Sequence, residues 1–75
     1  MTIEVWFNKN KMKTFDNIEE TRAYVKELSD SKKNDIDLYR YWENRNKDIV
    51  VDYGSHNDFI YIKGVDIVTY IDYID

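Results

Sequence analysis

Polar and apolar residues alternate strictly at the start of the chain. In residues 2–8, the side chains of Ile3, Val5 and Phe7 fall on one side of an extended chain. On the other side lie the side chains of Thr2, Glu4, Trp6 and Asn8. Because successive side chains of a strand point to opposite faces, this period of two predicts a half-buried β-strand. The polar run at 8–11 is predicted to be a loop.

The spacing changes to a helical one in residues 16–29. Positions three and four residues apart form one face, which consists of Ile18, Thr21, Val25 and Leu28. Asp16 and Glu19 predict a capping box, since an Asp oxygen can accept from the third helical amide while the Glu side chain reaches back. We expect one amphipathic helix, followed by a loop at 29–34.

Three further strands are predicted by β-favouring runs at 36–43, 48–53 and 58–63. The Asn-rich residues 44–47 and the Gly-containing residues 54–57 are typical of turns. Because short turns join neighbouring antiparallel strands, the three runs are expected to form a meander.

The last segment, from residue 65 onward, has two interpretations. Helical spacing relates four of its residues, Ile67, Tyr70, Ile71 and Ile74. Asp66 can cap such a helix. The residue types are nevertheless strand-favouring, and Lys63 and Gly64 could form a hairpin turn. The spacing favours a short helix, with a fifth strand as the alternative.

These elements predict a single α+β domain over residues 1–75. Its order is β-α-β-β-β followed by the short C-terminal helix or fifth strand. The antiparallel sheet is expected to lie on the helix at 16–29. A chain of this length supports one modest core.

Pairing the meander through its turns predicts which side chains share a face. If Glu43 lies opposite Asp48, then Tyr41 lies opposite Val50. If Tyr53 lies opposite Asp58, then Val50 lies opposite Tyr61. The aliphatic face would consist of Leu38, Trp42, Ile49, Val51, Ile60 and Ile62, interrupted by Arg40. The aromatic face would consist of Tyr39, Tyr41, Val50, Phe59 and Tyr61, edged by Glu43, Asp48 and Asp52. A slip of one residue in either turn would exchange the faces.

The aromatic face can be covered or open. If the C-terminal segment lies over it, the rings are core. If it is uncovered, the rings and carboxylates form a contact surface, since aromatic residues are enriched at the centres of interfaces. Aromatic residues make up 16% of the chain, which is more than a small core needs, so some are expected at the surface.

Charge indicates the kind of partner. The net charge is −4, and residues 34–75 carry nine acidic and four basic side chains, against six and seven in residues 1–33. An acidic surface gains no affinity by neutralising phosphates, which argues against a nonspecific nucleic-acid binder. It favours a protein partner with a basic surface, although solubility alone would account for the same pattern.

Catalytic and metal chemistry have little support in the sequence. The chain has no Cys and one His, which excludes disulfides, thiolate zinc sites and multi-histidine sites. Gly54 and Gly64 are isolated, so no phosphate-binding loop is present. Ser55, His56 and Asp58 lie within one turn, where they cannot easily be oriented as a hydrolase triad. We therefore expect neither an enzyme nor a cofactor.

The sequence thus predicts a noncatalytic protein-binding module or inhibitor, including an inhibitor of a nucleic-acid-processing enzyme. The contact is expected to involve Tyr39, Tyr41, Phe59, Tyr61, Glu43, Asp48 and Asp52. A homo-oligomeric structural protein, such as a homodimer, is the alternative. Single-stranded nucleic-acid binding has less support, because carboxylates flank the aromatic face.

Composition adds expectations about origin and location. Ile, Lys, Tyr and Asn are abundant and Pro is absent, which indicates AT-rich codons and an AT-rich bacterium or its phage. The first residues lack a basic region followed by an apolar run, and no apolar run approaches the roughly 20 residues of a membrane span. We expect a cytoplasmic protein with no membrane partner.

Overall fold

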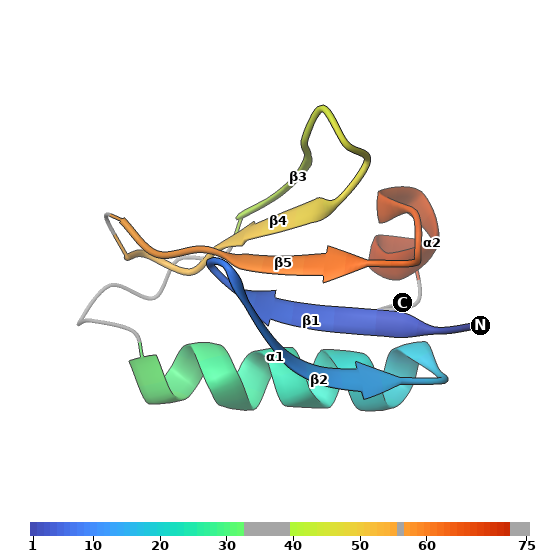
Figure 1. Cartoon of the computed structure of the whole chain (residues 1–75), viewed down its shortest axis with the longest axis horizontal. Helices are drawn as coiled ribbons and strands as arrows, with labels where there is room; N and C mark the ends of the chain where they lie inside the picture. The colour runs from blue at the N-terminus through green and yellow to red at the C-terminus, as the bar shows by residue number, and fades with distance from the viewer. Residues whose placement is uncertain (33–39, 56, 73–75) are drawn as a thin grey trace.

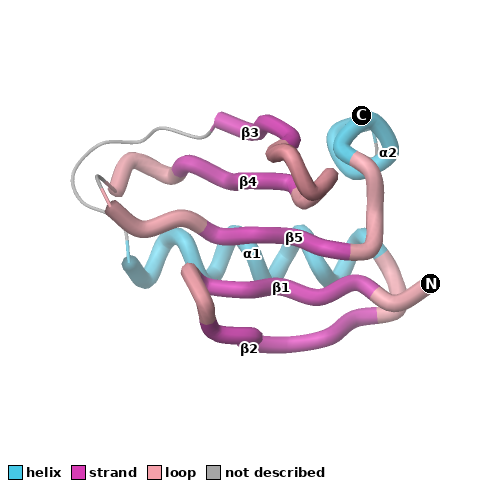
Figure 2. The backbone as a smooth tube through the Cα atoms, turned by 45° about the horizontal axis from the view of Figure 1, so that its top comes forward, coloured by secondary structure: helices cyan, strands magenta, loops and turns pink. Residues whose placement is uncertain are grey.

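The computed structural model describes residues 1–32, 40–55 and 57–72. Over these residues, five strands form one antiparallel sheet in the spatial order β2-β1-β5-β4-β3. The strands are β1 (Ile3–Phe7), β2 (Asn10–Phe15), β3 (Arg40–Glu43), β4 (Ile49–Asp52) and β5 (Ile60–Lys63). The helices are α1 (Ile18–Lys32), along one side of the sheet, and α2 (Ile67–Asp72), at one end of it (Figure 1, Figure 2). The predicted α+β fold is confirmed.

The loop predicted at 8–11 is wrong, because strand β2 already begins at Asn10. Only a two-residue turn at Asn8 and Lys9 separates it from β1, and Asn8 has a φ of 54°, which Asn tolerates better than most residues. Every residue of β2 except Phe15 is exposed. Because this strand has almost no buried side, burial does not impose the alternation of apolar and polar residues that would predict a strand. It lies at the edge of the sheet, where its lysines discourage pairing with another sheet.

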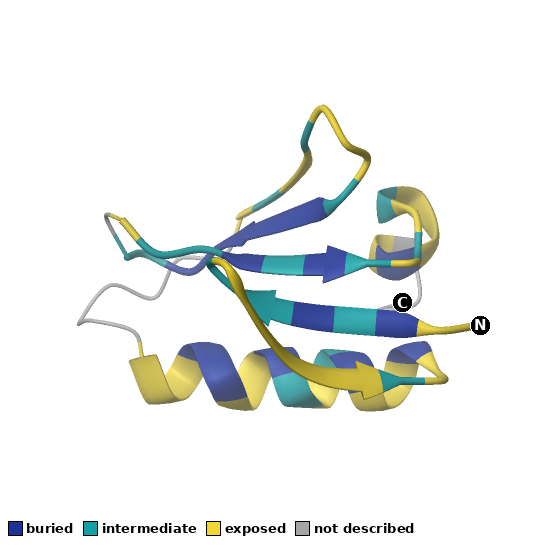
Figure 3. Ribbon diagram, viewed as in Figure 1, coloured by how far each residue is buried: buried dark blue, intermediate teal, exposed yellow. Residues whose placement is uncertain are grey.

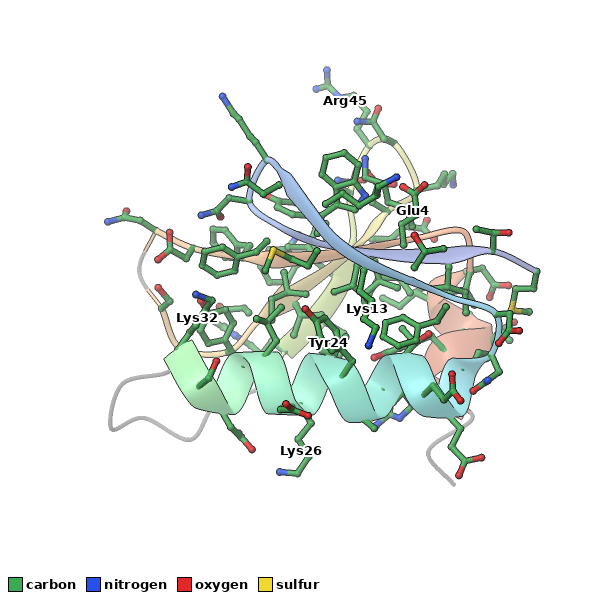
Figure 4. The ribbon with its side chains drawn as sticks, turned by 60° about the horizontal axis from the view of Figure 1, so that its bottom comes forward. Glu4, Lys13, Tyr24, Lys26, Lys32 and Arg45 are labelled. Atoms are coloured by element: carbon green, nitrogen blue, oxygen red, sulfur yellow. The ribbon has the colours of Figure 1, made fainter. Side chains whose placement is uncertain are left out.

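A bulge between Val5 and Trp6 interrupts the pairing of β1 with β2. Lys13, the partner of Val5, lies toward α1 (Figure 4). Its ammonium is 5.5 Å from the ring centroid of Phe15 and 5.6 Å from that of Tyr24. Because an aromatic ring attracts a cation over its face, the contact with Tyr24 of α1 holds β2 against the helix.

Helix α1 is capped one residue later than predicted. The Oδ1 atom of Asn17 accepts a hydrogen bond from the Glu20 amide at 2.8 Å, and its carbonyl accepts from the Thr21 hydroxyl at 2.7 Å. The N-cap is therefore Asn17, and the predicted capping box of Asp16 and Glu19 is wrong.

The helix also runs to Lys32, so the loop predicted from residue 29 is wrong over the described residues. The hydroxyls of Ser29 and Ser31 donate to the carbonyls of Lys26 and Leu28, at 3.0 and 2.7 Å. Bonding back to the preceding turn accommodates serine within a helix, where its hydroxyl would otherwise favour a turn.

The core lies between α1 and the adjacent side of the sheet (Figure 3). The helix contributes the predicted face of Ile18, Thr21, Val25 and Leu28, all of which are buried. The central strands contribute the fully buried side chains of Ile3, Val5, Ile49, Val51, Ile60 and Ile62. Burial of each large aliphatic side chain is worth on the order of 1.5–3 kcal/mol.

The chain turns from β5 into α2 at Gly64. Its φ is 99°, and a Cβ there would collide with the Thr2 carbonyl oxygen, so this close approach requires glycine. Asp66 then caps α2 by accepting from the Thr69 amide and hydroxyl at 2.8 and 2.7 Å. Tyr70, which is 1% exposed, fixes α2 to the core. The predicted C-terminal helix is confirmed.

Substituting Asn17 by Ala is expected to lower the free energy of unfolding by about 1 kcal/mol, because the Glu20 amide loses its acceptor. The matched control, Asp16→Ala, is expected to change it by less than about 0.5 kcal/mol. Urea denaturation followed by circular dichroism measures both. A larger effect of Asp16→Ala than of Asn17→Ala would show that the cap is assigned to the wrong residue.

The cap of α2 predicts a pH effect. Hydrogen bonds from the Thr69 amide and hydroxyl lower the pKa of Asp66 below its ordinary 3.8. A carboxyl whose pKa is lower in the folded chain stabilises the fold above its unfolded pKa, and this contribution is lost as the pH falls through the folded pKa. Thr69→Ala should move the pKa of Asp66 part of the way back up in an NMR titration, whereas an unchanged pKa would contradict the assigned cause.

Candidate functional site

The turn between β3 and β4 contains three residues, 45–47, instead of the expected four. Asn44 and Asp48 close it, since the Asn44 amide donates to the Asp48 carbonyl at 3.0 Å. The Asn44 side chain accepts from the amides of Asn46 and Asp48, each at 2.9 Å, and Lys47 adopts a φ of 69°. An Asn side chain bonded to the backbone two residues ahead is a known way of fixing a turn.

This shorter turn shifts the pairing of β3 by one residue. Trp42 lies opposite Val50 and Tyr41 opposite Val51, so the predicted pairing of Tyr41 with Val50 is wrong. The predicted pairing of Val50 with Tyr61 is confirmed. Because a one-residue shift moves a side chain to the other face, Trp42 joins Val50 and Tyr61, whereas Tyr41 joins the core side.

The shifted pairing therefore places the residues predicted to form the contact on two different sides of the sheet. Tyr39 lies outside the described residues. Tyr41 and Glu43 share the α1 side of the sheet with Val51 and Ile49, contrary to the prediction, because of the shifted pairing. The opposite side retains Asp48, Asp52, Phe59 and Tyr61, as predicted.

A cluster of aromatic side chains lies on the side of the sheet away from α1. We call this cluster the open face; it consists of Trp6, Trp42, Phe59 and Tyr61. Neither helix covers it (Figure 1). Trp42 is 41% exposed and the other three are partly exposed. The rings of Trp42 and Phe59 meet edge to face with centroids 5.9 Å apart. Val50 is 4% exposed although neither α1 nor α2 lies over it, so neighbouring side chains cover it.

Like Trp42, which was predicted on the aliphatic face, Trp6 is a member of the open face that the sequence prediction did not place in the contact. It pairs with Tyr61 across β1 and β5. Its indole nitrogen donates to the Glu4 carboxylate at 2.9 Å, and the Lys63 ammonium lies 5.0 Å from its ring centroid. A signal was present in the sequence, because the alternation in residues 2–8 places this large ring on the otherwise polar side.

The carboxylates near the open face are paired with cations from adjacent strands. The Arg40 guanidinium lies 3.0 Å from the Asp52 carboxylate, and the Lys63 ammonium lies 3.4 Å from that of Asp48. Asp52 is also buried. These pairs largely neutralise the acidic edge that the sequence predicted. A contact on this side would therefore depend on the rings more than on free negative charge.

A shallow groove of about 630 Å³ follows the aromatic cluster. Trp6, Phe59 and Tyr61 line it together with a polar rim of Asn8, Lys9, Asn44, Asn46, Asp48, Asn57 and Lys63. The Asn8 side chain donates to Asp58 at 2.9 Å and accepts from the Phe59 amide at 3.0 Å. Hydrogen bonds thus hold this part of the rim in place.

The described residues include no group of three or more side chains suited to hold a metal ion. His56 lies outside the described residues, and the Ser55 hydroxyl donates to the Asp58 carboxylate at 3.5 Å. No described helix is long and apolar enough to cross a membrane. Comparisons with protein families, curated proteins and solved structures gave no match.

The shifted pairing predicts different roles for adjacent residues of β3. Tyr41→Ala removes a ring packed against Tyr70, with centroids 6.0 Å apart, and should cost about 2 kcal/mol or more of unfolding free energy. Trp42→Ala removes a ring that is largely at the surface and should cost about 1 kcal/mol or less. Chemical denaturation compares the two. If Trp42→Ala is the more damaging substitution, the two faces of β3 are wrongly assigned.

Proposed function

We propose that this protein is a noncatalytic binding module whose open face contacts another protein. The observation that carries the proposal is the clustering of Trp6, Trp42, Phe59 and Tyr61 on a side of the sheet that neither described helix covers (Figure 2). Aromatic side chains are enriched at the centres of protein interfaces, where Trp and Tyr account for much of the binding energy.

The geometry of these rings supports a contact role. Trp42 rests against Phe59, while Trp6 is held by Glu4 and Lys63. Side chains that are already ordered lose less conformational entropy when a partner binds. Such a surface can therefore contribute apolar area at a lower entropic cost than flexible side chains would.

The partner's chemistry follows from the charges. Because Asp48 and Asp52 are held in ion pairs with Lys63 and Arg40, the proposal does not require carboxylates that imitate phosphates. It requires an apolar surface that fits the rings, bordered by groups that can hydrogen-bond to the polar rim. The chain's net charge of −4 would still steer a basic protein toward it over a longer range.

Site-specific photo-crosslinking in the native host tests this proposal. A photoreactive phenylalanine analogue would replace Trp42 or Tyr61 on the open face, and Val68 as the control. Val68 is an exposed apolar residue of α2, 64% accessible, outside the open face. We expect the two open-face positions to capture the same protein and the Val68 position not to capture it.

Two outcomes would contradict the proposal. Equal capture from Val68 would show that the contact does not belong to the open face. Cross-linking of the chain only to itself would show that the open face joins copies of this chain, as the homo-oligomeric alternative expects.

A further inference from the structure

A second concave site lies on the opposite side of the sheet, between α1 and α2. It has a volume of about 340 Å³ and is lined by Arg22, Ala23, Val25, Lys26, Tyr41 and Tyr70. Its residues are distinct from those of the open face, so an inference about it does not depend on the proposed protein contact.

Arg22 supplies an unused hydrogen-bond donor at this pocket. Its Nη1 atom is buried, and no described residue accepts a hydrogen bond from it. Leaving a buried donor unsatisfied costs roughly 1–3 kcal/mol, more for a charged group. Because Nη1 is covered, an acceptor that entered the pocket would reach this donor only when a covering side chain moves aside, and it would then recover this cost.

The Tyr70 ring orients the guanidinium for such an acceptor. The central carbon of the Arg22 guanidinium lies 5.0 Å from the Tyr70 ring centroid. A cation–π contact occupies the face of a guanidinium, whereas its N–H donors lie in the plane. Burial raises the pKa of Tyr70, so this phenol stays neutral and its charge does not compete for the cation.

The other cation of the pocket is already paired. The Lys26 ammonium lies 3.2 Å from the Asp30 carboxylate, and the side chain projects away from the sheet (Figure 4). The aliphatic part of Lys26 therefore contributes to the wall, while Arg22 contributes the charge. The remaining walls are the Tyr41 and Tyr70 rings and the apolar side chains of Ala23 and Val25.

We propose that this pocket binds a carboxylate carried on a small apolar or aromatic body. The Arg22 guanidinium, which forms no ion pair with the residues that the structure describes, matches one negative charge, and its planar N–H donors match the two oxygens of a carboxylate. The aromatic and methyl-bearing walls suit an apolar body. The volume is at the small end of ligand sites and is large enough for a single substituted ring.

NMR titration of the full chain with benzoate tests this proposal. Benzoate should produce saturable shifts at the Arg22 side-chain N–H and at Tyr41 and Tyr70, whereas benzamide, its uncharged counterpart, should not. Arg22→Met should weaken benzoate binding about tenfold or more, the loss expected for a charge-assisted hydrogen bond. The matched control is Arg45→Met, because Arg45 is exposed in the β3–β4 turn, far from this pocket (Figure 4).

Equal binding of benzoate and benzamide, or equal losses in Arg22→Met and Arg45→Met, would overturn the proposal, as would the absence of saturable shifts. If Arg22→Met does not fold, benzoate binding is measured with Arg22→Lys instead, because lysine keeps the positive charge but lacks the planar N–H donors. Weaker benzoate binding by folded Arg22→Lys supports the site, and unchanged binding overturns it.

A second arm distinguishes the sources of the carboxylate. N-acetylphenylalanine represents the C-terminus of a peptide, and its amide is the uncharged control. Tighter binding of N-acetylphenylalanine than of benzoate assigns the pocket to a peptide end. The reverse order assigns it to a free aromatic acid.

Discussion

The side-chain oxygen of Asn44 determines which way β3 faces. By accepting from the Asn46 and Asp48 amides, it closes a turn of three residues between β3 and β4. A turn with one more residue would reverse every side chain of β3, because side chains alternate along a strand. The observed turn directs Trp42 away from α1 and Tyr41 toward it.

Both candidate surfaces depend on this direction. Above the sheet, Trp42 meets Phe59 and completes the aromatic cluster with Trp6 and Tyr61. Below it, Tyr41 meets Tyr70, against which the Arg22 guanidinium rests. One hairpin thus separates the open face from the pocket lined by Arg22, Tyr41 and Tyr70. The ion pair of Asp52 follows from the same register, because it places Arg40 opposite Asp52.

The spacing of apolar residues correctly predicted the helices and strands that have one buried and one exposed side. The face of α1, the pairing of β4 with β5 and the helix at the C-terminus follow from patterns that burial enforces. Strand β2 was missed because it is exposed almost throughout and carries no such pattern. The register of β3 was missed because the Asn-rich residues 44–47 are compatible with a loop of three or four residues, and only the bonds of Asn44 decide between them. That error exchanged Trp42 with Tyr41 and Glu43 in the candidate site.

Side-chain NOEs in the isotope-labelled protein test the register most directly. With the three-residue turn, we expect NOEs from the Trp42 indole to the Val50 methyl groups and the Phe59 ring, together with NOEs from the Tyr41 ring to Tyr70. NOEs from Tyr41 to Val50 and from Trp42 to Ile49 would instead show the register of the longer turn. That result would remove Trp42 from the open face and Tyr41 from the pocket, and with them the basis for both proposed sites.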